Sequence, residues 1–161
     1  MSSYSRRTLL VSLAALGGCG FEPVYAPGGS AESLRGALSF DAPKTTDQFD
    51  FVARLEERLG RASAAPYALS YSLKFSGART AITPDLVAQR ETLNGQADFT
   101  VKNALGETLT TGAVRSFSSF SARGTTVATR ASEQDARKRL MVILADQVVS
   151  RLIATAPTWL P

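Results

Sequence analysis

The segment YALSYSLKFS, residues 67–76, alternates large apolar side chains with small or polar ones at every second position. Successive side chains of a β-strand point to opposite faces of the sheet, so a period of two predicts a strand with one buried and one polar face. An apolar face of this size has to be covered by other elements. This segment therefore predicts a sheet, and the rest of the chain has to supply its other strands and its cover.

Three further segments are typical of strands. Alternation favours a first strand from Leu34 to Phe40, and residues 93–102 and 107–121 have the pattern of a long hairpin. The hairpin is expected to turn at residues 103–106, where Gly106 suits a left-handed backbone. A loop is expected around Thr83-Pro84-Asp85.

Two segments have the signals of helices. The spacing Thr45-x-x-Gln48 resembles a capping box, and Gly60 closes the segment; a second, longer helix is expected from Ser132 to Ala156-Pro157. Apolar residues recur at helical spacing in both. In order along the chain they are Phe49, Val52, Leu55 and Leu59, then Leu140, Met141, Leu144, Val148 and Leu152.

This order of elements predicts an α+β fold. Two helices packed on one face of a mostly antiparallel four-stranded sheet, in the order β-α-β-β-β-α, would bury all the apolar stripes. The other face of the sheet would then stay half polar.

The N-terminus has the pattern of an export signal. Arg6 and Arg7 precede an apolar run, residues 9–16, which is too short to span a bilayer because a span takes about 20 residues. Leu16-Gly17-Gly18-Cys19 resembles the lipobox of bacterial lipoproteins. That resemblance implies cleavage before Cys19, a thioether-linked diacylglycerol on its sulfur and an N-acyl chain. Gly20, in place of aspartate, implies sorting to the outer membrane.

The chain then divides into a signal peptide (1–18), a lipidated tether (19–32) and a single domain (33–161). Ser5-Arg6-Arg7 is compatible with either the general or the twin-arginine export route, and the sequence leaves that choice open.

Composition excludes several classes of function. The formal net charge is +4 and falls by two without Arg6 and Arg7, which argues against a nucleic-acid binder. The chain has no histidine and one cysteine, so we expect no histidine-based catalysis and no metal site. Phosphate-loop and Ser-x-x-Lys motifs are absent as well. We expect no enzyme, and no cofactor other than the lipid on Cys19.

The start and the end of the mature chain together resemble one family. Cys19-Gly20-Phe21-x-Pro23-Val24-Tyr25 after a lipobox is similar to the start of LptE, the lipopolysaccharide-assembly lipoprotein family of Gram-negative outer membranes. The segment LADQVVSRLIA, residues 144–154, is similar to the last helix of that family, and the expected order of elements matches its fold.

The resemblance implies a lipid-anchored outer-membrane protein on the periplasmic side or in the lumen of a barrel. Such a protein plugs the large β-barrel LptD, helps it assemble, and assists transport of lipopolysaccharide to the outer leaflet. Four arginines between Pro66 and Ala131 are candidates for binding the phosphates of lipid A, by charge and placement alone. They are Arg79, Arg90, Arg115 and Arg123.

One alternative function and several structural questions stay open at this point. The chain could instead be an outer-membrane lipoprotein that serves another envelope machine as a scaffold or auxiliary subunit. The sequence also leaves open which face meets a barrel and whether lipopolysaccharide binds directly. Phe117 and Phe120, three residues apart on a predicted strand, should face opposite sides, and the pattern does not say which of them leaves the core.

Overall fold

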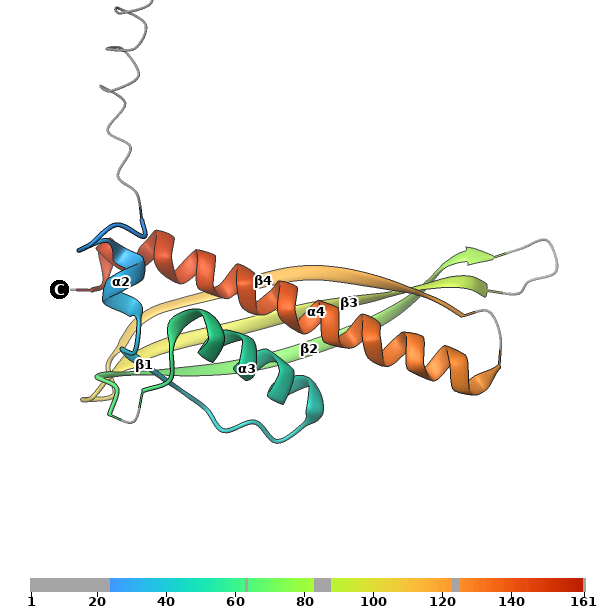
Figure 1. Cartoon of the computed structure of the whole chain (residues 1–161), viewed down its shortest axis with the longest axis horizontal. Helices are drawn as coiled ribbons and strands as arrows, with labels where there is room; N and C mark the ends of the chain where they lie inside the picture. Colours follow the sequence, from blue (N-terminus) through green and yellow to red (C-terminus); the bar gives the residue numbers. More distant parts are fainter. Residues whose placement is uncertain (1–23, 63, 83–87, 123–124, 161) are drawn as a thin grey trace, which may run out of the picture.

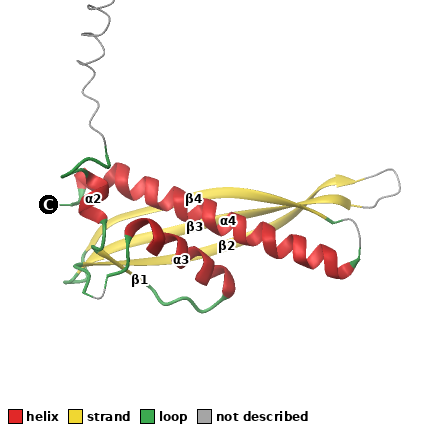
Figure 2. Ribbon diagram, viewed as in Figure 1, coloured by secondary structure: helices red, strands yellow, loops and turns green. Residues whose placement is uncertain are grey.

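A computed structural model describes residues 24–62, 64–82, 88–122 and 125–160 of the chain, and the α+β prediction is confirmed. One four-stranded sheet, in the order β1-β2-β3-β4, has two helices packed across one face (Figures 1 and 2). The elements are α2 (Ser30–Leu34), β1 (Leu38–Phe40), α3 (Thr46–Leu59), β2 (Tyr67–Ile82), β3 (Ala88–Asn103), β4 (Thr108–Ser121), α4 (Thr126–Thr155) and a 3-10 turn (Ala156–Thr158).

The sheet is mixed, with one parallel pair. β1 runs parallel to β2, whereas β2 with β3 and β3 with β4 are antiparallel. The helix α3 connects β1 to β2, which is the kind of crossover that a parallel pair requires. The hairpin between β3 and β4 turns where expected, and Gly106 has φ +84°.

The first strand is shorter than predicted. Leu34 ends α2 and is fully buried, so its apolar side chain belongs to a helix, and the strand begins only at Leu38. In contrast, β2 and β3 each have 16 residues, because pairing continues past the alternating segment to Ile82 opposite Ala88. The expected loop around residues 83–85 lies outside the described residues.

The core lies between the sheet and the two long helices. Tyr71 and Leu73 point to the same side of β2 as Leu69 and pack against this core, and the Tyr71 ring lies 5.2 Å from that of Phe51. On the same face, β3 contributes alternate buried residues between Leu93 and Val101. The face predicted to pack under the helices is therefore the buried one.

The prediction of the buried stripe of α3 is wrong for one residue, Phe49. Phe49 is 63% exposed, and Phe51 takes its place in the core beside Val52, Leu55 and Leu59. At about 100° per residue, Phe49 lies roughly 105° from the middle of the buried stripe, whereas Phe51 lies roughly 55° from it, at the opposite edge of the stripe. The predicted cap is confirmed, since the Thr45 hydroxyl accepts from the Gln48 amide at 3.3 Å.

The last helix begins earlier than predicted. It starts at Thr126, with the Thr125 hydroxyl accepting from the Ala128 amide at 3.3 Å, instead of at Ser132. This helix is long and apolar enough to cross a membrane by length and composition, but 44% of its most apolar window is buried in the domain. It lies along β4 and beside α3, so it is a core helix (Figure 1).

Two local features fix α4 in place. A Cβ at Gly95 of β3 would lie 2.9 Å from Leu140 Cδ2, so the missing side chain lets α4 approach the sheet. On the α3 side, the Arg54 guanidinium binds both carboxylate oxygens of Asp146 at 2.9 and 3.0 Å, and Arg58 adds a bond at 3.0 Å. Hydrogen bonding to Asp146 raises the pKa of Arg54.

Candidate functional site

The side of the sheet that faces away from α3 and α4, here called the open face, carries the residues that burial does not explain. It consists of even positions of β2 and β3 and odd positions of β4, because paired residues share a face. Its members between the two ends of the sheet are Ser70, Ser72, Lys74, Ser76, Thr92, Asn94, Gln96, Asp98, Thr100, Thr111, Ala113, Arg115, Phe117 and Ser119.

Four of these side chains form a hydrogen-bonded chain across three strands. Lys74 Nζ donates to Asp98 Oδ2 at 2.8 Å, and Gln96 Nε2 donates to Asp98 Oδ1 at 2.5 Å. Arg115 Nε donates to Gln96 Oε1 at 2.8 Å. The hydrogen bond from Lys74 is the main reason that the pKa of Asp98 lies below its usual value, and Gln96 adds to the effect. This network holds one carboxylate between two cations at the middle of the open face.

A shallow hollow of about 440 Å³ adjoins the network. Lys74, Gln96 and Arg115 line it together with Phe117, whose side chain is 64% exposed. Phe120, on the opposite side of the same strand, is 9% exposed and lies on the face of the sheet that the helices cover. Of the two phenylalanines, Phe117 is therefore the one that leaves the core. Its ring is exposed to solvent beside Lys74 and Arg115.

Among the described residues, two of the four predicted arginines lie far apart on the sheet. Arg115 belongs to the network, but Arg90 is six residues along β3 from Gln96, a separation of about 20 Å at 3.3 Å per residue. Arg79 pairs with Glu91 across β2 and β3 near the same far end as Arg90. Arg123 and the lipid-attachment residue Cys19 lie outside the described residues.

Sequence reasoning missed the other members of the network. Lys74, Gln96 and Asp98 each occupy a polar position of an alternating strand, which places them on the open face once the strands are predicted. The register that sets Lys74 opposite Gln96 comes from the pairing of β2 with β3, and alternation within a single strand does not specify that pairing.

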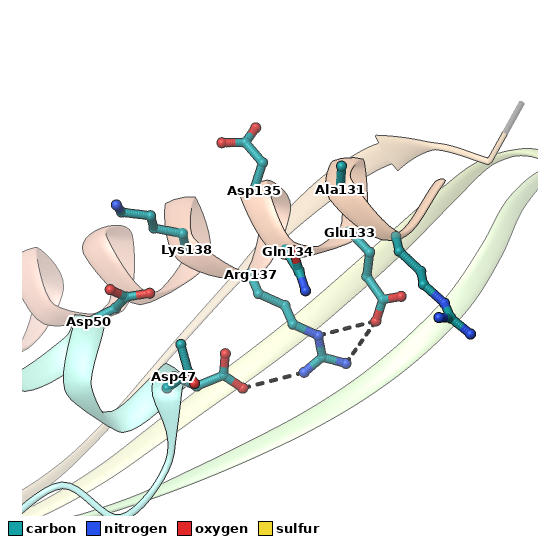
Figure 3. A pocket seen from close by; sticks show the side chains of 10 residues that line it. Asp47, Asp50, Ala131, Glu133, Gln134, Asp135, Arg137 and Lys138 are labelled. Carbon is teal, nitrogen blue, oxygen red and sulfur yellow. Dashed lines mark hydrogen bonds and ion pairs between the residues drawn. The ribbon is translucent and has the colours of Figure 1, made fainter. Parts of the chain in front are cut away.

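A second hollow, of about 840 Å³, lies between the start of α3 and the first half of α4 (Figure 3). Its Arg137 contacts Asp47 Oδ2 at 3.4 Å and Glu133 Oε1 at 3.0 Å, and lies 5.8 Å from the ring centre of Phe75. These charges satisfy one another and join the two helices, so we assign the hollow a structural role. The described residues contain no group of three or more His, Cys, Asp or Glu side chains suited to a metal.

Comparison with known proteins decides the family. The family model described as "LptE: Lipopolysaccharide-assembly" matches residues 37–152. This range includes all four strands, α3, and α4 apart from its last three residues. The chain belongs to the LptE family. The resemblance seen in the sequence is thereby confirmed, and the open face is the exposed sheet surface of an LptE-family domain. No curated protein sequence matches the chain.

Solved structures share the LptE-like fold at low identity. A lipoprotein from Caulobacter crescentus superposes with a TM-score of 0.68 at 20% identity, covering 79% of this chain and 96% of that one. The minor lipoprotein of Acinetobacter baumannii gives 0.58 at 19% identity, with 73% and 90% covered. Rare lipoprotein B of Shewanella oneidensis gives 0.60 at 13% identity, with 76% and 96% covered. At these identities the similarity concerns the fold alone.

Proposed function

We propose that this LptE-family protein is a lipid-anchored outer-membrane lipoprotein that plugs an LptD-type β-barrel, helps it assemble and assists lipopolysaccharide transport. The observation that carries the proposal is the family match over nearly the whole domain. Cys19 provides the anchor in this proposal, and the protein acts by binding, without catalytic turnover. Two or more acyl chains would make the attachment stable, since one chain holds a protein only marginally.

The open face supports a position inside a barrel. The lumen of a large outer-membrane barrel is polar and water-filled, so a plug needs sides that are compatible with water. Serine and threonine dominate the open face, and the charges at its centre are joined by hydrogen bonds. Such a surface can rest against a polar wall without a large cost of desolvation.

The hollow beside Phe117 is the part of the open face best suited to lipopolysaccharide. Arg115 uses Nε for Gln96, which leaves its two Nη groups directed to no other described residue. A guanidinium edge of this kind binds phosphate in a bidentate way, and Lys74 supplies a second cation in the same hollow. The exposed ring of Phe117 offers an apolar contact for the acyl part of the same molecule.

Co-purification tests the plug role. The tagged full-length protein, extracted in mild detergent from the bacterium that makes it, should carry one large β-barrel protein in a one-to-one complex. Its depletion should leave that barrel misassembled and reduce lipopolysaccharide at the cell surface. Recovery of the folded lipoprotein with no barrel would contradict the proposal.

Charge reversal tests the lipopolysaccharide contact separately. Lys74→Glu and Arg115→Glu should weaken binding of purified lipopolysaccharide, more strongly at low salt, where exposed charges are least screened. Arg90→Glu reports on the far end of the sheet, and Arg35→Glu, an exposed site next to α2, is the matched control. Equal binding by all of these variants would remove the phosphate contact and leave the plug role standing.

A further inference from the structure

The β4 strand forms a long free edge of the sheet. It is the last strand in the order β1-β2-β3-β4, and none of the described residues pairs with its outer side as a strand. The edge has 14 residues, Thr108–Ser121, whereas β1 at the opposite side has three. Natural sheets usually keep their edge strands short or protect them, because unpaired N–H and C=O groups attract other strands.

The backbone hydrogen bonds of the sheet show which groups of β4 point outward. Tyr67 N donates to Ala37 O and Asp41 N donates to Leu69 O, both at 3.2 Å, so odd residues of β2 bond toward β1. Even residues of β2 therefore bond toward β3, and by the observed register odd residues of β3 bond to even residues of β4. The backbone groups of the odd residues of β4 then face outward. Consistent with this, Arg139 Nη2 donates to Ser119 O at 3.3 Å.

This edge lacks the usual protection over most of its length. From Leu109 to Ser118 it has no proline, lysine or acidic residue, and Arg115 is its one charged residue. Its register shift lies at one end, next to Lys102. By comparison, the edge of β2 beyond β1 carries Lys74 and two register shifts between Arg79 and Ile82, which are devices that discourage pairing.

A shallow groove of about 610 Å³ runs beside the β4 edge on the helix side. Val114 of β4 and Ile143 and Ala154 of α4 supply apolar lining, and Arg151 supplies positive charge. Arg115 borders the groove at the strand edge, but its side chain belongs to the open face. Arg151 makes no ion pair with any described residue, and the single carboxylate of the groove, on Asp146, already binds Arg54 and Arg58. The groove therefore presents uncompensated positive charge next to an unpaired edge.

We propose that the β4 edge takes up a fifth strand from another protein of the envelope. The unpaired backbone groups can form hydrogen bonds with an extended polypeptide added as a strand. The groove fits apolar side chains of that added strand where they face Ile143. A carboxylate on each side of the added strand would form ion pairs with the two arginines, Arg115 on the open face and Arg151 on the helix side. This goes beyond the plug role, because it concerns an added strand whatever protein supplies it.

A second copy of this chain fits the edge less well. A symmetric antiparallel pairing about the middle of β4 would bring two Arg115 side chains together, and like charges directly opposite are destabilising. An acidic segment of another protein has no such conflict.

Photocrosslinking in cells of the bacterium that makes the protein tests the proposal. A photoreactive phenylalanine analogue replaces exposed Phe117 in the full-length chain, and the same analogue at exposed Ala53 on α3 is the control position. Ala113→Pro then removes one outward N–H and leaves the bonds between β3 and β4 in place. Its matched control is Ala113→Ser, which keeps the N–H. Arg151→Glu probes the groove with no change in the backbone.

The proposal expects a Phe117 crosslink that maps to one extended segment with acidic residues, and none to that segment from Ala53. Loss of an edge hydrogen bond of about 1 kcal/mol, together with local misfit, should lower the crosslink yield about tenfold in Ala113→Pro. Arg151→Glu should also lower it, and Ala113→Ser should leave it unchanged. A crosslink to a second copy, to lipid alone or to no protein would overturn the proposal, as would a yield in Ala113→Pro and in Arg151→Glu equal to that of the parent protein. Barrel co-purification in the same extracts reports on the plug role independently.

Discussion

Gly112→Ala should destabilise the domain, because the ring of Phe99 occupies the space where the new methyl group would go. Gly112 of β4 pairs with Phe99 of β3 on the core side of the sheet, and Phe99 is 4% exposed. A Cβ built at Gly112 lies 2.5 Å from Phe99 Cζ and 2.7 Å from Cε1. The absence of a side chain at Gly112 thus leaves room for the Phe99 ring.

The size of the effect follows from these distances. Carbon atoms in contact prefer about 3.5–4.0 Å, so the ring has to move by roughly 1 Å or more within a packed core. Overpacking of this kind typically costs 1–3 kcal/mol, and we expect about 2 kcal/mol here. Gly77 of β2 is the matched control, since a Cβ there meets no atom within 4 Å. Gly77→Ala should be neutral or stabilise by up to about 1 kcal/mol, because it restricts the unfolded chain.

Urea unfolding of the two variants, followed by far-UV circular dichroism, measures the difference. Adding Phe99→Leu to Gly112→Ala should recover part of the loss, so that the double variant is less destabilised than the sum of the single variants. If Gly112→Ala were as stable as Gly77→Ala, the Phe99 ring could not lie on Gly112, and the pairing of Phe99 with Gly112 would be wrong.

Three other predictions test the core, the network and the anchor. The Tyr71 hydroxyl is buried and finds no hydrogen-bond partner among the described residues, so Tyr71→Phe should unfold within about 1 kcal/mol of the parent or be slightly more stable, as measured by urea unfolding. The pKa of Asp98 is lowered by Lys74, so its contribution to stability is complete above the unfolded pKa of about 3.9 and is lost as pH falls through the lower folded value. Asp98→Asn should therefore flatten the acid side of the stability–pH curve, slightly because the pair is exposed, and an unchanged curve would count against the ion pair. Cys19→Ala should abolish fatty-acid labelling and leave the circular dichroism of the domain unchanged; labelling that persists would refute the lipobox interpretation.

Strand alternation predicted the fold because the segments with the strongest alternation form regularly paired strands in the structure. Tyr67 to Phe75 alternate without interruption, and the capping residue Thr45 and the turn residue Gly106 have the conformations that their chemistry favours. Alternation failed where an apolar residue served another element. Leu34 fits a strand pattern but belongs to the short helix α2, which only tertiary packing stabilises.

The start of α4 shows a second limit of sequence reasoning. Thr125-Thr126-Val127 gives a weak helix signal, because threonine and valine are β-branched, and the predicted helix therefore began only at Ser132. In the structure, Thr125 caps the helix and Val127 is 78% exposed on its first turn. This first turn buries little, so its helical state follows from the cap and from the packed helix that continues it.

The candidate site was harder to predict than the core for a reason of geometry. Charge alone selected four arginines, but a site on a sheet is made by residues that share a face and a register. Arg115 meets Gln96 because of the β3–β4 pairing, and Lys74 meets Asp98 because of the β2–β3 pairing, so the network exists only when both pairings are known. The same alternation that sends every second residue into the core leaves the residues between them free of packing constraints. On this sheet the open face can therefore change its charges and its binding with little effect on the fold, whereas Gly95 and Gly112, on the other face, cannot gain even one carbon atom without displacing a core side chain.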